Sequence, residues 1–336
     1  MRKALCWMGT GVLLAACAAQ PARGPAPESY TAETTYAKLA PAYPFIRIAS
    51  RAVPATVRAV TNVTYVRRAG HDLQLDLYLP AAAATAPRPA IVFVHGGGWR
   101  AGVRANFAPM AIRMAERGYA AATISYRLAG EAPYPAAIHD AKAAVRWVRT
   151  HAGAYDIDGD RIAIAGGSAG GQIAALTGVT NGESRFDSDG GPGAVSSAVQ
   201  AIVNIDGLSD FTSEEARRYE DDPAKQPSSA GAWFGGRYAE KTALWRDASP
   251  LFHVGPGTPP VLFIGSAQRR FSVGRDAMVA RLQVLGVPHR VVLVPDTPHS
   301  FWLFDPWLEP TVDATDAFLR EVIPPRTDRP GSPPAA

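Results

Sequence analysis

Short apolar segments that alternate with helical segments most strongly limit what this chain can fold into. Strand-like runs lie at residues 62–67, 73–79, 90–94, 119–126, 161–165, 199–205, 261–264 and 291–294. Helical apolar spacing lies between or after them, at residues 107–117, 135–150, 172–177, 276–285 and 311–322. Strands joined through helices pair in parallel, so the pattern predicts one α/β domain in three layers, with a mostly parallel, twisted sheet of about eight strands. Residues 207–250 show no strand pattern and predict a small insertion after the sixth strand.

Composition indicates a soluble globular domain with a substantial core rather than a disordered or nucleic-acid-binding chain. Of 336 residues, 47% are apolar and 19% are charged, which excludes the composition typical of disorder. The net charge is only +4 and the basic residues are scattered, so no nucleic-acid partner is expected. Two cysteines are too few for a disulfide framework or a four-cysteine zinc site.

The N-terminus carries an export pattern. A basic start is followed by an apolar segment too short to span a membrane, and the segment ends Leu14-Ala15-Ala16-Cys17. This ending resembles the lipobox of bacterial lipoproteins, which implies cleavage before Cys17, a lipid on its sulfur, export, and anchoring, with Ala18 favouring the outer membrane. The alternative is an ordinary cleaved signal peptide. We expect a signal peptide at 1–16, a tether at 17–44, the domain at 45–323 and a disordered tail at 324–336.

A Gly-x-Ser-x-Gly motif at residues 166–170 lies between a predicted strand and a predicted helix. A serine at such a sharp turn has an exposed hydroxyl, and glycines are needed because side chains would collide there. The motif predicts that Ser168 is a nucleophile. A phosphate-binding loop is excluded, because the chain contains no Gly-Lys dipeptide.

Two further loops carry candidate groups. His95-Gly96-Gly97-Gly98-Trp99 follows a predicted strand, and consecutive glycines let backbone N–H groups point at a developing oxyanion. We expect His95 to be structural. His299 lies on a loop after the last strand, where the general base of a hydrolase belongs.

No metal or other cofactor is expected. The chain has no His-Glu-x-x-His pair. Asp156, Asp158 and Asp160 resemble the start of a calcium loop, but Gly167 stands where that loop needs a glutamate.

The motifs, in this order, resemble the α/β-hydrolase superfamily, in the branch of the hormone-sensitive-lipase-like esterases and the bacterial feruloyl and acetyl esterases. The resemblance spans residues 60–322 and implies the α/β-hydrolase fold. By position it implies Ser168 as nucleophile and His299 as base, with the backbone amides of Gly97, Gly98 and Ala169 as the oxyanion hole.

The acid of the triad is where the chain departs from these families. They place an aspartate in the loop after residues 261–264, and this chain has Gln268 there. Glutamine cannot stabilise an imidazolium by charge. Asp206, which ends the preceding strand, is our first candidate; Asp276 is the second, and Asp296 the third. A Ser–His dyad without an acid is the remaining alternative.

The expected activity is that of an exported serine esterase. Resemblance to acetyl esterases, together with export, favours deacetylation of plant polysaccharide such as xylan or pectin. Feruloyl esters and generic short-chain carboxylic esters are the alternatives, and a catalytically weak fold that binds carbohydrate or protein is another. Trp233, Phe234, Trp245 and the aromatic residues at 301–307 could line a substrate site or form core.

Overall fold

The main sheet of the protein has eight strands in the order β2-β3-β5-β4-β6-β7-β8-β9. The computed structural model describes residues 27–68, 70–187 and 194–324. The strands are β2 (Val57–Arg68), β3 (His71–Pro80), β4 (Arg88–Val94), β5 (Ala120–Ile124), β6 (Ile157–Gly167), β7 (Ala201–Ile205), β8 (Val261–Gly265) and β9 (His289–Leu293). The strands from β5 to β9 in this order pair in parallel, and β3 is antiparallel to both neighbours. The mostly parallel sheet predicted from the sequence is confirmed.

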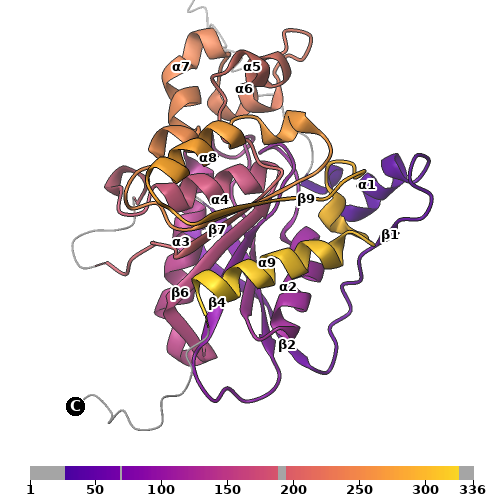
Figure 1. Ribbon diagram of the computed structural model, residues 1–336, viewed down its shortest axis with the longest axis vertical. Helices are drawn as coiled ribbons and strands as arrows, with labels where there is room; N and C mark the ends of the chain where they lie inside the picture. Colours follow the sequence, from indigo (N-terminus) through magenta and orange to yellow (C-terminus); the bar gives the residue numbers. More distant parts are fainter. Residues whose placement is uncertain (1–26, 69, 188–193, 325–336) are drawn as a thin grey trace, which may run out of the picture.

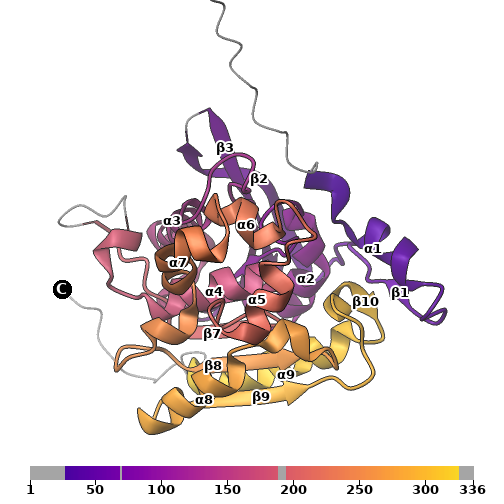
Figure 2. The same cartoon turned by 90° about the horizontal axis from the view of Figure 1, so that it is seen from above.

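Helices cover both faces of this sheet and make three layers (Figures 1 and 2). The α-helices are α1 (Ala32–Leu39), α2 (Ala108–Glu116), α3 (Ala136–Thr150), α4 (Ala169–Val179), α5 (Glu214–Glu220), α6 (Ser229–Phe234), α7 (Tyr238–Asp247), α8 (Arg275–Val284) and α9 (Leu308–Val322). Short 3-10 turns are η1 (Pro27–Ser29), η2 (Arg104–Phe107), η3 (Ala152–Tyr155), η4 (Ser184–Phe186), η5 (Pro250–His253), η6 (Arg269–Ser272) and η7 (Phe301–Leu303). Helices α3, α4 and α8 share one apolar core, and α2 and α9 share the other.

The central strands are apolar on both faces because each face is covered. In β4, Val92 and Val94 join the core under α3 and α4, whereas Ile91 and Phe93 join the core under α2 and α9. All four side chains are fully buried. This explains why β4 is a continuous apolar run in the sequence rather than an alternating one.

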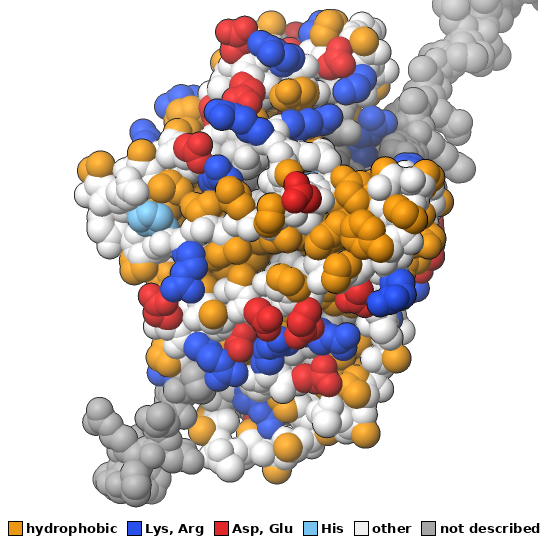
Figure 3. Space-filling view, turned by 45° about the vertical axis from the view of Figure 1, so that its right-hand side comes forward, with side chains coloured by type: hydrophobic (Ala, Val, Ile, Leu, Met, Phe, Trp, Pro, Cys, Tyr) orange, Lys and Arg blue, Asp and Glu red, His pale blue; other side chains and the backbone are white. Residues whose placement is uncertain are grey.

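The edge strand β9 is less covered than the centre of the sheet. Val291 and Leu293 are 40% and 58% exposed. On the face shown in Figure 3, apolar side chains gather in a band, with acidic and basic side chains interspersed above and below it. The functional residues described below lie at the covered centre of the sheet instead.

The segment between β7 and β8 forms the predicted insertion above the carboxyl ends of the strands (Figure 1). It consists of α5, α6, α7 and η5, and the described residues contain no strand there. Trp233, Phe234 and Trp245 are at most 2% exposed and pack against one another in its centre. These three aromatic side chains are therefore core of the insertion, which decides for them the alternative left open by the sequence.

The N-terminal boundary of the domain needs correction. Residues 27–44 were expected to belong to the tether, but η1 and α1 fold there, and Thr31 caps α1 through a capping box. The Tyr30 hydroxyl bonds the Ser300 hydroxyl at 2.8 Å, and Ala32 is buried. β1 (Arg47–Ile48) then pairs with β10 (Phe304–Asp305). Low apolar content hid this segment, because α1 buries only one side chain.

Several sequence predictions lie outside the described residues. They concern the signal peptide at 1–16, the lipidation of Cys17, the first part of the tether and the tail from 325 on, and they stay predictions. None of the helices in the described ranges has the length and apolar character that crossing a bilayer requires.

Candidate active site

Ser168 occupies a sharp turn between β6 and α4. Its φ of 57° and ψ of −125° are strained for a residue with a side chain. The Ser168 N–H donates to the carbonyl of Ile205 at 2.8 Å, and its own carbonyl accepts from the N–H of Gln172 at 3.1 Å. The turn is thus fixed by β7 on one side and by the first turn of α4 on the other.

The glycines around Ser168 are required by close packing. A Cβ on Gly170 would lie 2.1 Å from the carbonyl oxygen of Val94, and a Cβ on Gly167 would lie 2.5 Å from the ring of Trp302. Both distances are far below any real Cβ contact. The Gly-x-Ser-x-Gly pattern therefore lets α4 approach β4 closely, as predicted from the motif.

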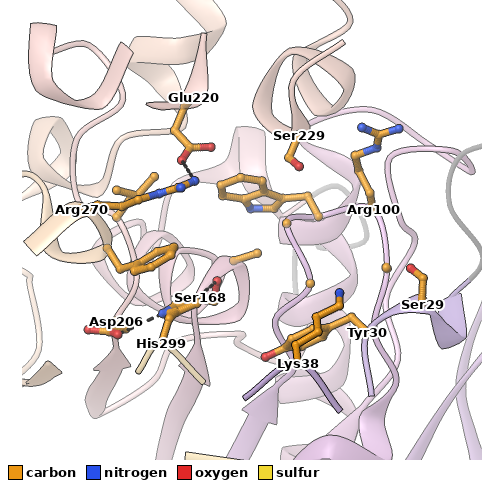
Figure 4. A pocket seen from close by; sticks show the side chains of 17 residues that line it. Ser29, Tyr30, Lys38, Arg100, Ser168, Asp206, Glu220, Ser229, Arg270 and His299 are labelled. Atoms are coloured by element: carbon orange, nitrogen blue, oxygen red, sulfur yellow. Dashed lines mark hydrogen bonds and ion pairs between the residues drawn. The ribbon is translucent and has the colours of Figure 1, made fainter. Parts of the chain in front are cut away.

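His299 and Asp206 complete a hydrogen-bonded chain with Ser168 (Figure 4). His299 Nε2 lies 2.8 Å from Ser168 Oγ, and His299 Nδ1 lies 3.0 Å from Asp206 Oδ2. The three residues come from the turn after β6, the end of β7 and the loop after β9. The structure thus brings together the nucleophile, the base and the first-ranked acid of the sequence analysis.

Asp206 is held rigidly, as an acid that orients a histidine must be. Its side chain is completely buried, and its second oxygen accepts the backbone N–H of Ser266 at 2.8 Å. Ser266 lies in the loop after β8, where the resemblance to the esterase families led us to expect the acid. The loop after β8 therefore supports the carboxylate that comes from β7.

The other acid candidates lie elsewhere. The Asp276 side chain is 73% exposed and pairs with Arg275 at 2.9 Å. Asp296 is an exposed turn residue with a φ of 57°. Gln268 is exposed in the loop after β8.

Aromatic rings surround the imidazole of His299. The ring of Phe271 stacks on it with centroids 3.4 Å apart and 8° between the planes, and Trp302 meets it edge-on at 5.4 Å. Burial lowers the pKa of His299 below its ordinary value, Asp206 opposes this shift by bonding the ring, and the nearby charge of Arg270 adds to the lowering. The ring is therefore neutral near pH 7, as a general base must be.

The His-Gly-Gly-Gly-Trp loop lies beside Ser168 and has an unusual backbone. Gly97, Gly98 and Trp99 have φ values of 120°, 58° and 60°. Gly97, Gly98 and Ala169 line the same cavity as Ser168. Among the described residues, no carbonyl accepts the N–H groups of Gly97 and Gly98.

His95 has a structural position. It is 2% exposed, its Nδ1 bonds the carbonyl of Gly96 at 2.8 Å, and its ring stacks on Tyr126. Burial lowers the pKa of His95 to about 4, so it stays neutral. Its side chain supports the turn of the glycine loop.

Ser168 and His299 open into a cavity of about 340 Å³. Its walls come from the glycine loop, the insertion, η6 and the N-terminal segment. Figure 4 shows Tyr30, Lys38 and Arg100 on the side facing Arg270 and His299. Charged side chains such as Lys38 and Arg270 share the walls with apolar ones such as Trp99 and Phe271, so the cavity can accept an ester that has both a polar and an apolar part.

Sequence reasoning missed Tyr30, Lys38 and Phe271 as parts of this site. The Thr-x-x-Thr spacing at residues 31–34 could have indicated the start of the helix that carries Lys38. Phe271 carries no sequence pattern that separates it from core aromatics. No group of three or more possible metal ligands occurs within residues 27–324 as described.

The profile of the BD-FAE family matches residues 75–271, which is more than half of the chain. The chain belongs to the BD-FAE family. This is a family of α/β-hydrolase esterases, in agreement with the branch indicated by the motifs. The BD-FAE match includes Ser168 and Asp206 but ends before His299 and begins after α1.

Individual relatives agree with the BD-FAE assignment. Esterase LipC of Mycobacterium tuberculosis is 32% identical over 262 residues, which is 74% of this chain and 62% of LipC. The chain spans less than two thirds of the length of the first curated relatives it matches.

Solved structures share the fold. Est2, an esterase of Thermogutta terrifontis, superimposes with a TM-score of 0.64 at 24% identity, over 82% of this chain and 95% of that chain. A truncated carbohydrate esterase from gut microbiota gives 0.66 at 24% identity, over 82% and 99%. At this identity the likeness shows the α/β-hydrolase fold.

Proposed function

We propose that the protein is a serine esterase that hydrolyses carboxylic esters through an acyl-enzyme. The observation that carries the proposal is the hydrogen-bonded chain Ser168–His299–Asp206 at the bottom of an open cavity. A nucleophile, a base and a buried acid in this order are what acyl transfer at neutral pH requires.

The reaction follows from these positions. Ser168 Oγ attacks the ester carbonyl while its proton passes to His299 Nε2, and Asp206 stabilises the resulting imidazolium. The N–H groups of Gly97, Gly98 and Ala169 stabilise the oxyanion, each such donor being worth roughly 3–4 kcal/mol. The ester bond then breaks, and the alcohol leaves with the proton from His299. Water attacks the acyl-enzyme by the same route and releases the carboxylic acid.

The substrate we propose is the acetyl ester of a plant polysaccharide such as xylan or pectin. The cavity is open to solvent and has charged groups among its lining residues, which suits a polymer carrying a small acyl group. One structural neighbour is named as a carbohydrate esterase. A feruloyl ester is the second candidate, because the BD-FAE family includes bifunctional acetyl/feruloyl esterases; generic short-chain esters are the third.

Two measurements test the activity and the acyl group. The wild type should release p-nitrophenol from p-nitrophenyl acetate, and Ser168→Ala should abolish the release while keeping the melting temperature. Turnover that survives in Ser168→Ala would overturn the mechanism. No turnover in the wild type on any ester would favour a binding protein. Acetate release from acetylated xylan and pectin, compared with ferulate release from feruloylated arabinoxylan, identifies the acyl group.

We further propose that the protein is exported and anchored to the outer membrane by a lipid on Cys17. The support is the sequence ending at Cys17. Labelled palmitate should be incorporated into the wild type and not into Cys17→Ser, and Cys17→Ser should leave the membrane fraction. Equal labelling of both would contradict lipidation at this residue.

A further inference from the structure

The N-terminal segment, residues 28–39, is fixed beside the catalytic histidine. The Tyr30 hydroxyl bonds Ser300 Oγ at 2.8 Å, directly after His299 in the chain. Asn106 Nδ2 donates to the Tyr30 carbonyl at 3.1 Å. Burial raises the pKa of Tyr30 to about 12, so its phenol stays protonated and can donate to Ser300. This segment lies outside the residues matched by the family profile.

The same segment brings a cation to the cavity. Lys38, in the last turn of α1, is exposed and lines the cavity that contains Ser168. Figure 4 shows its amine on the cavity side, near Tyr30. Within the described ranges, no carboxylate lies within ion-pair distance of Lys38.

Arg100 is a second cation on this wall. It follows the glycine loop, is half-buried, and donates from Nη1 only to the carbonyl of Pro227 at 3.3 Å. It too has no carboxylate partner in the part of the chain that the structure describes. Arg270 across the cavity differs, because Glu220 lies 3.5 Å from it and balances its charge. The wall with Lys38 and Arg100 therefore carries two uncompensated positive charges.

We propose that Lys38 and Arg100 form a cationic wall for the carboxylates of acidic sugars, so that the preferred substrate is an esterified polysaccharide that contains uronic acid residues. This inference rests on the proposed esterase function and specifies its substrate. A neutral acetyl group gives no reason to place two cations without carboxylate partners on one wall of the cavity that contains the nucleophile. Uronates flanking the esterified sugar would pair with one or the other of these cations, and a guanidinium can hold a carboxylate through two hydrogen bonds.

The test is inhibition of p-nitrophenyl acetate turnover by oligosaccharides without ester groups. Three inhibitors are compared: oligogalacturonate, glucuronate-substituted xylo-oligosaccharide and neutral xylo-oligosaccharide. An exposed ion pair contributes about a two- to fivefold change in affinity, so Lys38→Ala/Arg100→Ala should raise the Ki of a uronate oligomer about 4- to 25-fold. The neutral oligosaccharide should show no such change. The Ki of the uronate oligomer should also rise with salt, because exposed charges are screened.

Matched variants separate the outcomes. Lys38→Arg keeps the charge and should keep the low Ki. Arg58→Ala removes an exposed cation at the start of β2, away from the cavity, and should change nothing. Equal inhibition by charged and neutral oligomers, or a Ki unchanged in the double variant, would overturn the proposed role of the cationic wall while Ser168-dependent turnover persists. If the wild type does not hydrolyse p-nitrophenyl acetate at all, the esterase proposal itself is refuted. Whichever uronate oligomer binds more tightly identifies the source of the acidic sugar.

Discussion

Replacement of Asp206 by asparagine is the most informative single change in this site. Asp206 accepts two N–H donors, His299 Nδ1 at 3.0 Å and the backbone of Ser266 at 2.8 Å. An asparagine has one oxygen and one amide group in the same place. If its oxygen keeps the bond to Ser266, its NH₂ group faces His299 Nδ1 and favours the tautomer that has the proton on Nε2. That tautomer cannot take the proton of Ser168.

The expected loss in kcat is therefore large. In serine hydrolase triads the same change costs about 10⁴ in turnover, which corresponds to roughly 5 kcal/mol. We expect at least a hundredfold loss of kcat for Asp206→Asn. The effect on the free energy of unfolding should be smaller, about 1–2 kcal/mol, because a hydrogen bond from His299 to a carboxylate is replaced by one between neutral groups.

Turnover of p-nitrophenyl acetate and thermal unfolding, measured on the same preparations, check this prediction. Asp276→Asn is the matched control, because Asp276 is a 73% exposed carboxylate paired with Arg275. It should keep wild-type kcat. Near-normal turnover in Asp206→Asn, or a large loss in Asp276→Asn, would refute the assignment of the acid and the reasoning about the tautomer.

Three more changes test the surroundings of the triad. Phe271→Ala exposes His299. Because burial lowers the pKa of His299, this exposure should move the acidic limb of the kcat/KM profile to higher pH, and an unchanged limb would contradict the prediction. Gly170→Ala places a Cβ 2.1 Å from a carbonyl oxygen of β4 and should destabilise the fold by at least about 2 kcal/mol in urea unfolding, whereas wild-type stability would contradict the close approach. Tyr30→Phe removes the bond to Ser300 and should lower kcat about fivefold with KM unchanged, as tested by steady-state kinetics; a change in KM alone would argue against positioning.

The central part of the fold could be predicted because its signals are local. The buried strands around β4 and β6 appear as short apolar runs in the sequence. The sharp turn at Ser168 needs glycines, and these can be recognised in the Gly-x-Ser-x-Gly motif. His299 could be located because a loop after the last strand of such a sheet returns to the same edge. These features depend on residues close together in the chain.

The rest depended on contacts between distant segments. Asp206 and His299 are separated by 93 positions, and only their pairing across the sheet edge distinguishes Asp206 from Asp276. Trp233 and Trp245 could equally well have lined the cavity, because an aromatic residue in an insertion looks the same whether it faces core or substrate. The sequence around Tyr30 has no periodic pattern of apolar residues, because this segment is held in place by a hydrogen bond and a single buried alanine.

The central claim is that Ser168 is a nucleophile activated by His299 and Asp206. Its most direct test is intact-mass spectrometry after reaction with a fluorophosphonate, followed by mapping of the modified peptide. The account predicts one adduct per chain, on Ser168, which is absent in Ser168→Ala and forms at least a hundredfold more slowly in Asp206→Asn. An adduct on another residue, or an unmodified wild type under conditions that label a known serine esterase, would contradict it.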